Sequence, residues 1–333
     1  MKSALILVVL LGSLTLSVAS AQPSVEGCAK AQSSKVIINV RERGAKGDGR
    51  ADDTAAIQKA IDEVAGTGGM ALLPDGIYMV NAVAPRQLTL KSRMTLKLSQ
   101  GATLKAISNG ASHYAILTIT GGSNVSVIGG NLEGDREHHQ GTSGEWGMGL
   151  RIMGGAEHIT IIDVTARKMW GDGFYIDGAK DVRICGVTAD YNRRQGLSII
   201  DAIDVFITGS VFKNTRGTRP SAGIDLEPDR ADQTIRNVSI TRSKFLDNAG
   251  AGIQILGKKG TANVSDVRIK SNLFRGSPPV KVKYADGVLD SAICHNRYAT
   301  RPEPSRDPAM VATDVQEMTI LAGCGDPGLR IRY

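Results

Sequence analysis

Short runs in which apolar and polar residues alternate recur along the chain. Six of them share one pattern, and they are NVSVIGGNLEG (124–134), HITIIDVTARK (158–168), DVRICGVTADY (181–191), DVFITGSVFKN (204–214), VSITRSKFLDN (238–248) and VRIKSNLFRGS (267–277). Alternation over a few residues indicates a strand with one buried side, because successive side chains of a strand point to opposite faces. Each run therefore predicts a short β-strand.

A second strand, led by glycine, follows most of these runs. The five examples are GLRIM (149–153), GFYID (173–177), GLSII (196–200), GIDLE (223–227) and GIQIL (252–256). By subtraction, their glycines lie 24, 23, 27 and 29 residues apart. A period of this size, without a long helix in each unit, is typical of stacked coils. The repeat predicts an all-β fold, a single-stranded right-handed parallel β-helix.

Aligning the five glycines predicts which side chains share a face. Two columns should point inward, and they are Leu150, Phe174, Leu197, Ile224 and Ile253, and Ile152, Ile176, Ile199, Leu226 and Ile255. Two columns should point outward, and they are Arg151, Tyr175, Ser198, Asp225 and Gln254, and Met153, Asp177, Ile200, Glu227 and Leu256. The polar outward residues gather on the middle coils, where we expect the functional site.

The two ends of the stack need protection, because an open coil exposes an unpaired strand edge. Asp53 and Thr54, followed by Ile57, Ile61 and Val64 at helical spacing, predict an amphipathic helix that Asp53 caps and that ends at Gly66. We expect this helix to close the first coil. One β-helix domain should cover 22–300, and a tail over 301–333 should pack on the outside or close the far end.

The first residues have the order of a cleavable secretory signal. Lys2 precedes an apolar run from Ala4 to Leu16, and Ala19-Ser20-Ala21 follows. The run is shorter than the roughly 20 residues of a membrane span, and no later segment is apolar for that length. We therefore expect a signal peptide over 1–21, a secreted or periplasmic protein, and no membrane span.

Four cysteines, Cys28, Cys185, Cys294 and Cys324, allow three pairings in an oxidising compartment. We expect Cys294 to pair with Cys324, which would tie down the C-terminal tail. Cys185 lies in an apolar strand, where a cysteine is usually a small buried residue. None of the four has the spacing of a metal site.

Paired carboxylates supply the candidate chemistry. Asp177 and Glu227 fall two coils apart in one column, so their backbones should lie roughly 9.6 Å apart at about 4.8 Å per strand. Carboxyl groups at this spacing suit a glycosidase that uses one as acid and the other as base. Asp225 and Asp172 are the further catalytic candidates. For each acid taken alone, the alternative is a solvated surface or turn residue.

Cations and polar side chains beside these acids are candidates for substrate binding. Arg193, Arg194 and Gln195 lie on the intervening coil, and Arg151 and Tyr175 lie on the same face. A guanidinium group binds a substrate carboxylate or holds the acids of the enzyme ionised. Arg194 or Tyr175 can also serve as the base of a lyase, for which the acids would bind calcium. For a hydrolase we expect no metal and no cofactor.

The segment from Glu133 to Trp146 adds His138, His139 and Trp146, and Trp170 follows on the next coil. Aromatic rings stack on sugars, and loops on a rigid scaffold often carry binding residues. The alternative is that each tryptophan covers core at a corner of a coil. Neither histidine has a third ligand at a recognisable spacing, so we expect no metal here.

The segment VRERGAKGDGRADDTAAIQKAIDEVAGTGGMALLPDGIYMV (40–80) resembles the opening of the pectate-lyase-like superfamily. Within that superfamily it is most similar to the branch that holds rhamnogalacturonases, polygalacturonases and mannuronan epimerases. The resemblance continues over about 36–300 and implies a right-handed β-helix that acts on a polysaccharide. The chain lacks the Gly-His-Gly sequence of polygalacturonases and the Asp-Pro-His sequence of epimerases, so no catalytic residue is transferred from them.

These observations together favour a secreted glycoside hydrolase for an acidic, uronic-acid-containing polysaccharide. The formal net charge of +7 favours such a polymer as partner. We expect a monomer that binds no nucleic acid. A polyuronate lyase and a non-catalytic carbohydrate-binding or surface protein are the two alternatives.

Overall fold

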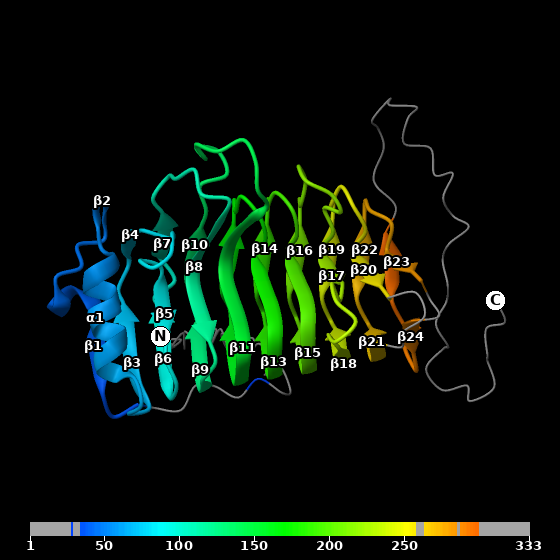
Figure 1. Ribbon diagram of the computed structural model, residues 1–333, viewed down its shortest axis with the longest axis horizontal. Coiled ribbons are helices and arrows are strands. Elements are labelled where there is room, and N and C mark those ends of the chain that lie inside the picture. Colours follow the sequence, from blue (N-terminus) through cyan, green and yellow to red (C-terminus); the bar gives the residue numbers. More distant parts are fainter. Residues whose placement is uncertain (1–27, 29–33, 258–262, 285–286, 300–333) are drawn as a thin grey trace, which may run out of the picture.

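The protein winds into a right-handed parallel solenoid whose coils stack along one long axis (Figure 1). The structure is a computed structural model that describes residue 28 and the ranges 34–257, 263–284 and 287–299. The predicted signal peptide and the predicted C-terminal tail lie outside the described residues. No helix in those ranges is long and apolar enough to cross a membrane.

Each full coil contributes a strand to each of three faces. Face A contains the five glycine-led strands and three others, namely β5 (Leu88–Leu90), β8 (His113–Thr120), the first parts of β11 (Trp146–Ile162), β13 (Phe174–Cys185) and β15 (Leu197–Thr208), and β17 (Ile224–Leu226), β20 (Ile253–Leu256) and β23 (Val280–Lys283). Face B contains β1 (Ile37–Asn39), β3 (Gly69–Leu73), β6 (Met94–Leu98), β9 (Ser123–Ile128), the last parts of β11, β13 and β15, and β18 (Ile235–Thr241), β21 (Val264–Lys270), β24 (Val288–Leu289) and β25 (Ala292–Cys294).

Face C is a separate sheet of ten short strands. They are β2 (Asp48–Asp52), β4 (Gly76–Val80), β7 (Ala102–Ala106), β10 (Asn131–Glu133), β12 (Thr165–Arg167), β14 (Thr188–Asp190), β16 (Val211–Lys213), β19 (Lys244–Leu246), β22 (Leu273–Arg275) and β26 (Arg297–Ala299). Each alternating run of the sequence thus splits into a face B strand and a face C strand, because the chain bends between them.

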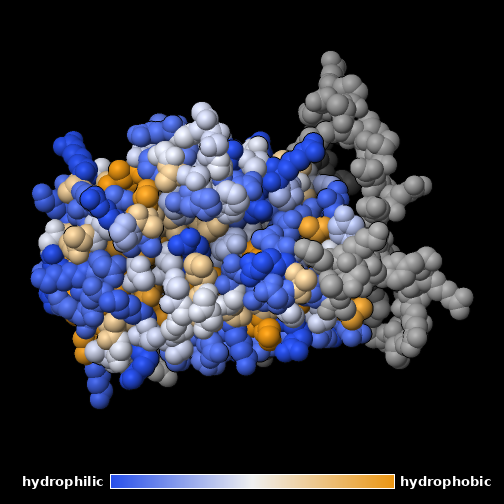
Figure 2. Space-filling view, viewed as in Figure 1, coloured by the Kyte–Doolittle hydropathy of each residue, from blue (hydrophilic) through white to orange (hydrophobic). Residues whose placement is uncertain are grey.

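The predicted inward columns form the core. Leu150, Phe174 and Leu197 pair in register on neighbouring strands, and all three are at most 1% exposed. Below face C, the rings of Phe212, Phe245 and Phe274 stack at centroid distances of 5.4 and 4.9 Å. The face of the molecule shown in Figure 2 carries many hydrophilic side chains, with hydrophobic ones scattered among them.

The repeated glycine of the glycine-led strands on face A has a packing cause. A Cβ atom at Gly196 would lie 2.4 Å from the carbonyl oxygen of Gly223, and one at Gly223 would lie 2.5 Å from that of Gly252. Real Cβ atoms do not approach a backbone oxygen so closely. The backbones of successive coils therefore meet at these positions, and only glycine fits.

The predicted N-terminal helix is present as α1 (Thr54–Val64), and it buries Ile57, Ile61 and Val64. Asp53 does not cap it through its side chain as predicted. Its carboxylate accepts instead from the backbone amides of Lys46, at 2.6 Å, and Gly47, at 3.0 Å. The acidic signature around residue 50 thus fixes the first coil, and closure of the stack by α1 stays a prediction.

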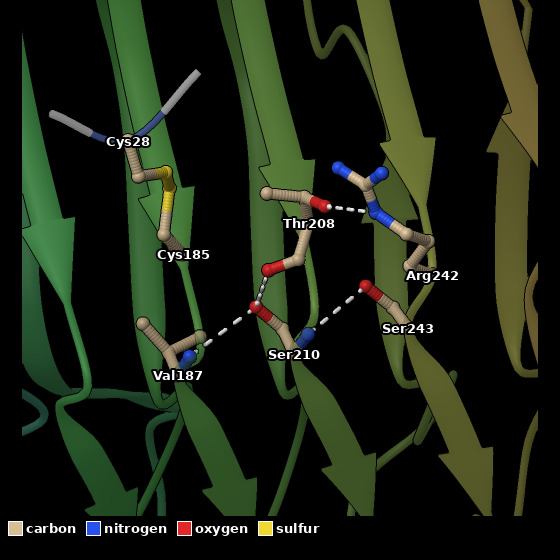
Figure 3. The surroundings of a disulfide bond; sticks show 7 residues. All are labelled: Cys28, Cys185, Val187, Thr208, Ser210, Arg242 and Ser243. Atoms are coloured by element: carbon tan, nitrogen blue, oxygen red, sulfur yellow. Dashed lines mark hydrogen bonds between the residues drawn. A yellow bond between two sulfur atoms is a disulfide. The ribbon is translucent and has the colours of Figure 1, made fainter. Parts of the chain in front are cut away.

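A disulfide joins Cys28 to Cys185 at the end of β13, across 157 residues of sequence (Figure 3). Cys185 is buried as predicted, at 3% exposure, and its bond to Cys28 is one of the three pairings that the sequence allows. The three possible pairings cannot be separated by spacing alone, because only the fold brings residue 28 beside β13, the sixth strand of face B. Cys324 lies outside the described residues, so its pairing with Cys294 stays a prediction.

Candidate functional site

A polar layer covers the middle of face A. Arg151, Tyr175, Ser198, Asp225 and Gln254 pair in one register, as predicted for the outward column. Ser198, Asp225 and Gln254 are nevertheless buried, at 0%, 1% and 6% exposure. Hydrogen bonds to neighbouring coils hold them, since Ser198 donates to Asp172, and Asp225 accepts from Gln195 and Gln254. The site therefore has a buried polar floor, and more exposed side chains surround it.

Arg194 is the centre of this layer, and its side chain is 12% exposed. Its guanidinium group lies 3.1 Å from Asp172 Oδ2, 3.6 Å from Glu145 Oε2 and 3.9 Å from Glu227 Oε2. One cation thus joins acids from three coils. Of the two roles predicted for this arginine, the structure favours the one in which it serves the acids of the protein itself.

Asp172, in the turn before β13, is completely buried. Its Oδ2 atom accepts from Ser198 Oγ at 2.9 Å and from Arg194 Nη1 at 3.1 Å, and its Oδ1 atom has no hydrogen-bond partner. Burial raises the pKa of Asp172 to about 6, although Arg194 and Ser198 act in the opposite direction. Asp172 therefore positions Arg194 from below.

Asp225 and Glu227 form a carboxyl pair on β17 and the residue after it. Asp225 accepts from Gln195 Nε2 at 2.7 Å and from Gln254 Nε2 at 3.1 Å. Burial raises the pKa of Asp225 well above its usual value, and the charge of Glu227 and a hydrogen bond to it raise the pKa further. The raised pKa favours the protonated form of Asp225. The Glu227 side chain is 24% exposed.

Asp177 lies on the same face in a second polar group. Its Oδ1 atom accepts from Gln233 Nε2 at 3.1 Å. Burial raises the pKa of Asp177, and the charges of Asp201 and Asp229 raise it further against Arg230. Ile200 was placed beside Asp177 by the alignment, and this is wrong. A register shift in β15 pairs Asp177 with Asp201, and Ile200 is 3% exposed.

Tyr175 and Arg151 are neighbours in the outward column of face A, next to these acidic groups. Burial raises the pKa of Tyr175, and the charges of Asp177, Asp229 and Asp172 raise it further. Arg151 is half-buried next to Tyr175 and has no acid within 4.0 Å among the described residues. Its Nε atom is buried without a hydrogen-bond partner. Arg151 is therefore a cation on this face that the described acids leave uncompensated.

The loop between β10 and β11 arches over the edge of face A (Figure 1) and is fixed by an internal stack. The His139 ring lies 4.1 Å from the Trp170 ring, and its Nδ1 atom lies 3.0 Å from Asp135 Oδ2. Tyr114 donates to the other oxygen of Asp135. Arg193 covers Trp170 at 3.8 Å and donates to the Gly144 carbonyl at 2.9 Å. These contacts hold the loop in place.

The exposed part of the same loop presents side chains that a ligand can reach. Trp146 is 37% exposed and stacks on His113, with centroids 4.4 Å apart and planes 8° apart. His138 is also exposed. Of the four aromatic and histidine side chains predicted to bind substrate, Trp146 and His138 thus lie accessible to a ligand. His139 and Trp170 lie mainly inside the loop stack.

Several site residues were missed from the sequence. Asp201 was hidden by the register shift, and Gln233 reaches Asp177 from 56 residues further along the chain. Asp135 and Tyr114 were missed because no local pattern marks a buried hydrogen bond between distant coils. Among the described residues no group of three His, Cys, Asp or Glu side chains is arranged to hold a metal ion.

Comparison with known proteins agrees with this architecture. Residues 37–276 match the family model described as rhamnogalacturonase A/epimerase, pectate lyase-like. The chain belongs to this family. The resemblance predicted from the first coil is thus confirmed, and it covers the coils that carry the site.

Members and structural neighbours of this pectate-lyase-like family differ in what they do. The chain is 25% identical over 288 residues to YclG of Bacillus subtilis (strain 168), covering 72% of this chain and 49% of that protein. It is 27% identical over 292 residues to plasmin and fibronectin-binding protein A of Streptococcus pneumoniae, covering 78% and 39%. The chain thus spans half or less of the length of these relatives.

Among solved structures, the Yersinia enterocolitica family 28 exopolygalacturonase superposes with a TM-score of 0.61 at 16% identity, covering 82% of this chain and 60% of that one. This likeness shows the fold alone. The family includes polysaccharide-active enzymes and a surface adhesin, so the activity of this chain has to be argued from its own residues.

Proposed function

We propose that this protein is a glycoside hydrolase that cleaves a uronic-acid-containing polysaccharide on face A, outside the cytoplasm. One observation carries the proposal. Asp225, whose pKa is raised, is paired with a partly exposed Glu227, and Asp177, whose pKa is also raised, lies two coils away on the same face. Two strand steps alone correspond to roughly 9.6 Å, and the register shift at Asp177 lengthens the separation of its backbone from that of Glu227. The side chains must therefore lean together to bring the carboxyl groups to the roughly 6.5–9.5 Å of inverting glycosidases.

The chemistry divides between an acid and a base. Asp177 is the general acid, because a raised pKa keeps its proton available for the departing glycosidic oxygen. Glu227 is the general base, which removes a proton from the attacking water. Asp225 and Asp172 are too buried to touch substrate, so they are positioning residues that orient Glu227 and Arg194.

The lyase alternative finds less support in the same geometry. A lyase base must be free to take a proton from the sugar carbon beside a carboxylate. Arg194 is surrounded by acids that favour its charged form, and burial first of all disfavours the phenolate of Tyr175. The two bases predicted for a lyase are therefore poorly suited to that role.

A non-catalytic carbohydrate-binding protein is the second candidate function. The similarity to a plasmin and fibronectin-binding protein favours it, as does the complete burial of Asp172. In that case the acids would only accept hydrogen bonds from sugar hydroxyls. The two candidates differ in whether the polymer is cut.

The test is incubation of the mature protein with a panel of acidic and neutral polysaccharides, reading reducing ends and unsaturated products together. We expect new reducing ends without the unsaturated chromophore. Glu227→Gln and Asp177→Asn should each lower kcat by about 10²-fold or more, since general acid and base groups typically contribute 10²–10⁴-fold. Asp232→Asn, at an exposed site, is the matched control. Unsaturated products would establish a lyase, and no cleavage of any polymer would favour the binding protein.

A further inference from the structure

We infer that three arginines on adjoining loops form a subsite for an anionic group of the polysaccharide, a carboxylate or a sulfate. We name Arg136, Arg193 and Arg216 the arginine rim. The inference rests on the proposed function only in taking the same polymer as ligand. It adds a binding position that lies outside the acids of face A, and it names the chemical class of ligand that this position selects.

The fold brings the three arginines together. They follow β10, β14 and β16, three strands of face C, in the loops that lead from face C towards face A. Gly217, which follows Arg216, lies between the side chains of Arg136 and Arg193. A Cβ atom there would be 2.9 Å from Arg193 Cγ and 3.5 Å from Arg136 Nη2. Residues 80 positions apart in sequence thus form one cluster.

The rim has no compensating acid within 4.0 Å among the residues that the structure describes. The acids nearby are engaged elsewhere, since Glu137 pairs with Lys168 at 2.8 Å and Glu145 lies 3.6 Å from Arg194. Neutral groups hold the rim arginines instead. Arg136 lies 3.9 Å over the Tyr191 ring and donates to the Tyr191 carbonyl at 2.8 Å.

The clustered positive charges favour the binding of an anion. Burial lowers the pKa of Arg136, and the neighbouring charges of Arg216 and Arg193 lower it further. Three guanidinium groups held together therefore repel one another, and a bound anion would offset this cost. A guanidinium group binds carboxylate or sulfate oxygens through two parallel hydrogen bonds, which a neutral sugar cannot match.

The position of the rim fits a polymer that crosses face A. Arg193 precedes Arg194, whose guanidinium group lies among Asp172, Glu145 and Glu227. The rim therefore adjoins the proposed catalytic acids along the same edge. A chain with its cleaved bond between Asp177 and Glu227 would present the anionic group of a nearby sugar to the rim, beside the exposed Tyr191.

The test measures binding in the Glu227→Gln background, so that the ligands are not consumed. Arg136→Gln and Arg216→Gln are each added, with Arg236→Gln on face B as the matched control, since Arg236 is also exposed. Calorimetry at low salt uses oligogalacturonate, sulfated dextran and neutral dextran, and thermal denaturation checks that each variant folds. Arg216 is exposed, so its substitution should leave the fold intact.

We expect each rim substitution to weaken binding of an anionic polymer about five- to tenfold and to reduce its salt dependence, with no change in the control. A selective effect on oligogalacturonate identifies a carboxylate as ligand, and one on sulfated dextran identifies a sulfate. Equal affinity of rim and control variants overturns the inference, and so does failure of the parent to bind either polyanion. Turnover by the Glu227→Gln protein would count against the hydrolase alone, so the two proposals fail separately.

Discussion

Asp172 shows how one buried side chain connects the site to the stability of the coil. Burial raises its pKa in the folded protein to about 6 from a usual value of 3.8. Between these values the folded protein binds more protons than the unfolded chain. Stability linked to Asp172 is therefore full below about pH 4 and is lost as the pH rises through about 6.

Asp172→Asn should remove this part of the pH dependence, which amounts to roughly 3 kcal/mol at about 1.4 kcal/mol per pKa unit. The measurement is the free energy of unfolding in denaturant at several pH values between 4 and 7. Asp232→Asn, at a surface site where Asp232 pairs with Arg230, should follow the wild-type profile. Parallel profiles for Asp172→Asn and wild type would show that Asp172 does not titrate in this range.

At the scale of the strand, the close approach of successive coils explains the glycine repeat. Gly196→Ala places a methyl group 2.4 Å from the Gly223 carbonyl oxygen, so the coils must separate. We expect a loss of about 1–3 kcal/mol in the free energy of unfolding, as for other overpacked sites. Gly110→Ala is the control, because its nearest neighbours would lie at 3.6 Å. Equal stability of the two variants would contradict the close approach.

The same strands show what the sequence can predict. The inward and outward columns follow from a period of two residues, so Phe174 and Tyr175 were placed on their faces correctly. The position of Asp201 depends on a register shift that alternation cannot reveal. The burial of Asp225 depends on Gln195 and Gln254, which come from other coils at separations of about 30 residues. Carboxyl identity was predictable, whereas exposure and protonation were not.

At the scale of the whole molecule, the Cys28–Cys185 disulfide ties the chain before the first coil to the middle of the stack (Figure 3). It closes a loop across 157 residues, and a loop of this length restricts the unfolded chain strongly. The double substitution Cys28→Ser with Cys185→Ser should lower the free energy of unfolding by roughly 2–5 kcal/mol. Denaturation of both proteins under oxidising conditions measures this, and coincident curves would contradict it.

In the proposed mechanism, the parallel stack holds an acid and a base two coils apart over a buried polar floor. The most direct test is digestion of an acidic polysaccharide in water enriched in a heavy oxygen isotope, followed by mass spectrometry of the products. Hydrolysis predicts that every cut adds one water and places one heavy oxygen at the new reducing end, and that Glu227→Gln abolishes this incorporation. Products that lack an added water would contradict the central claim and show cleavage by elimination.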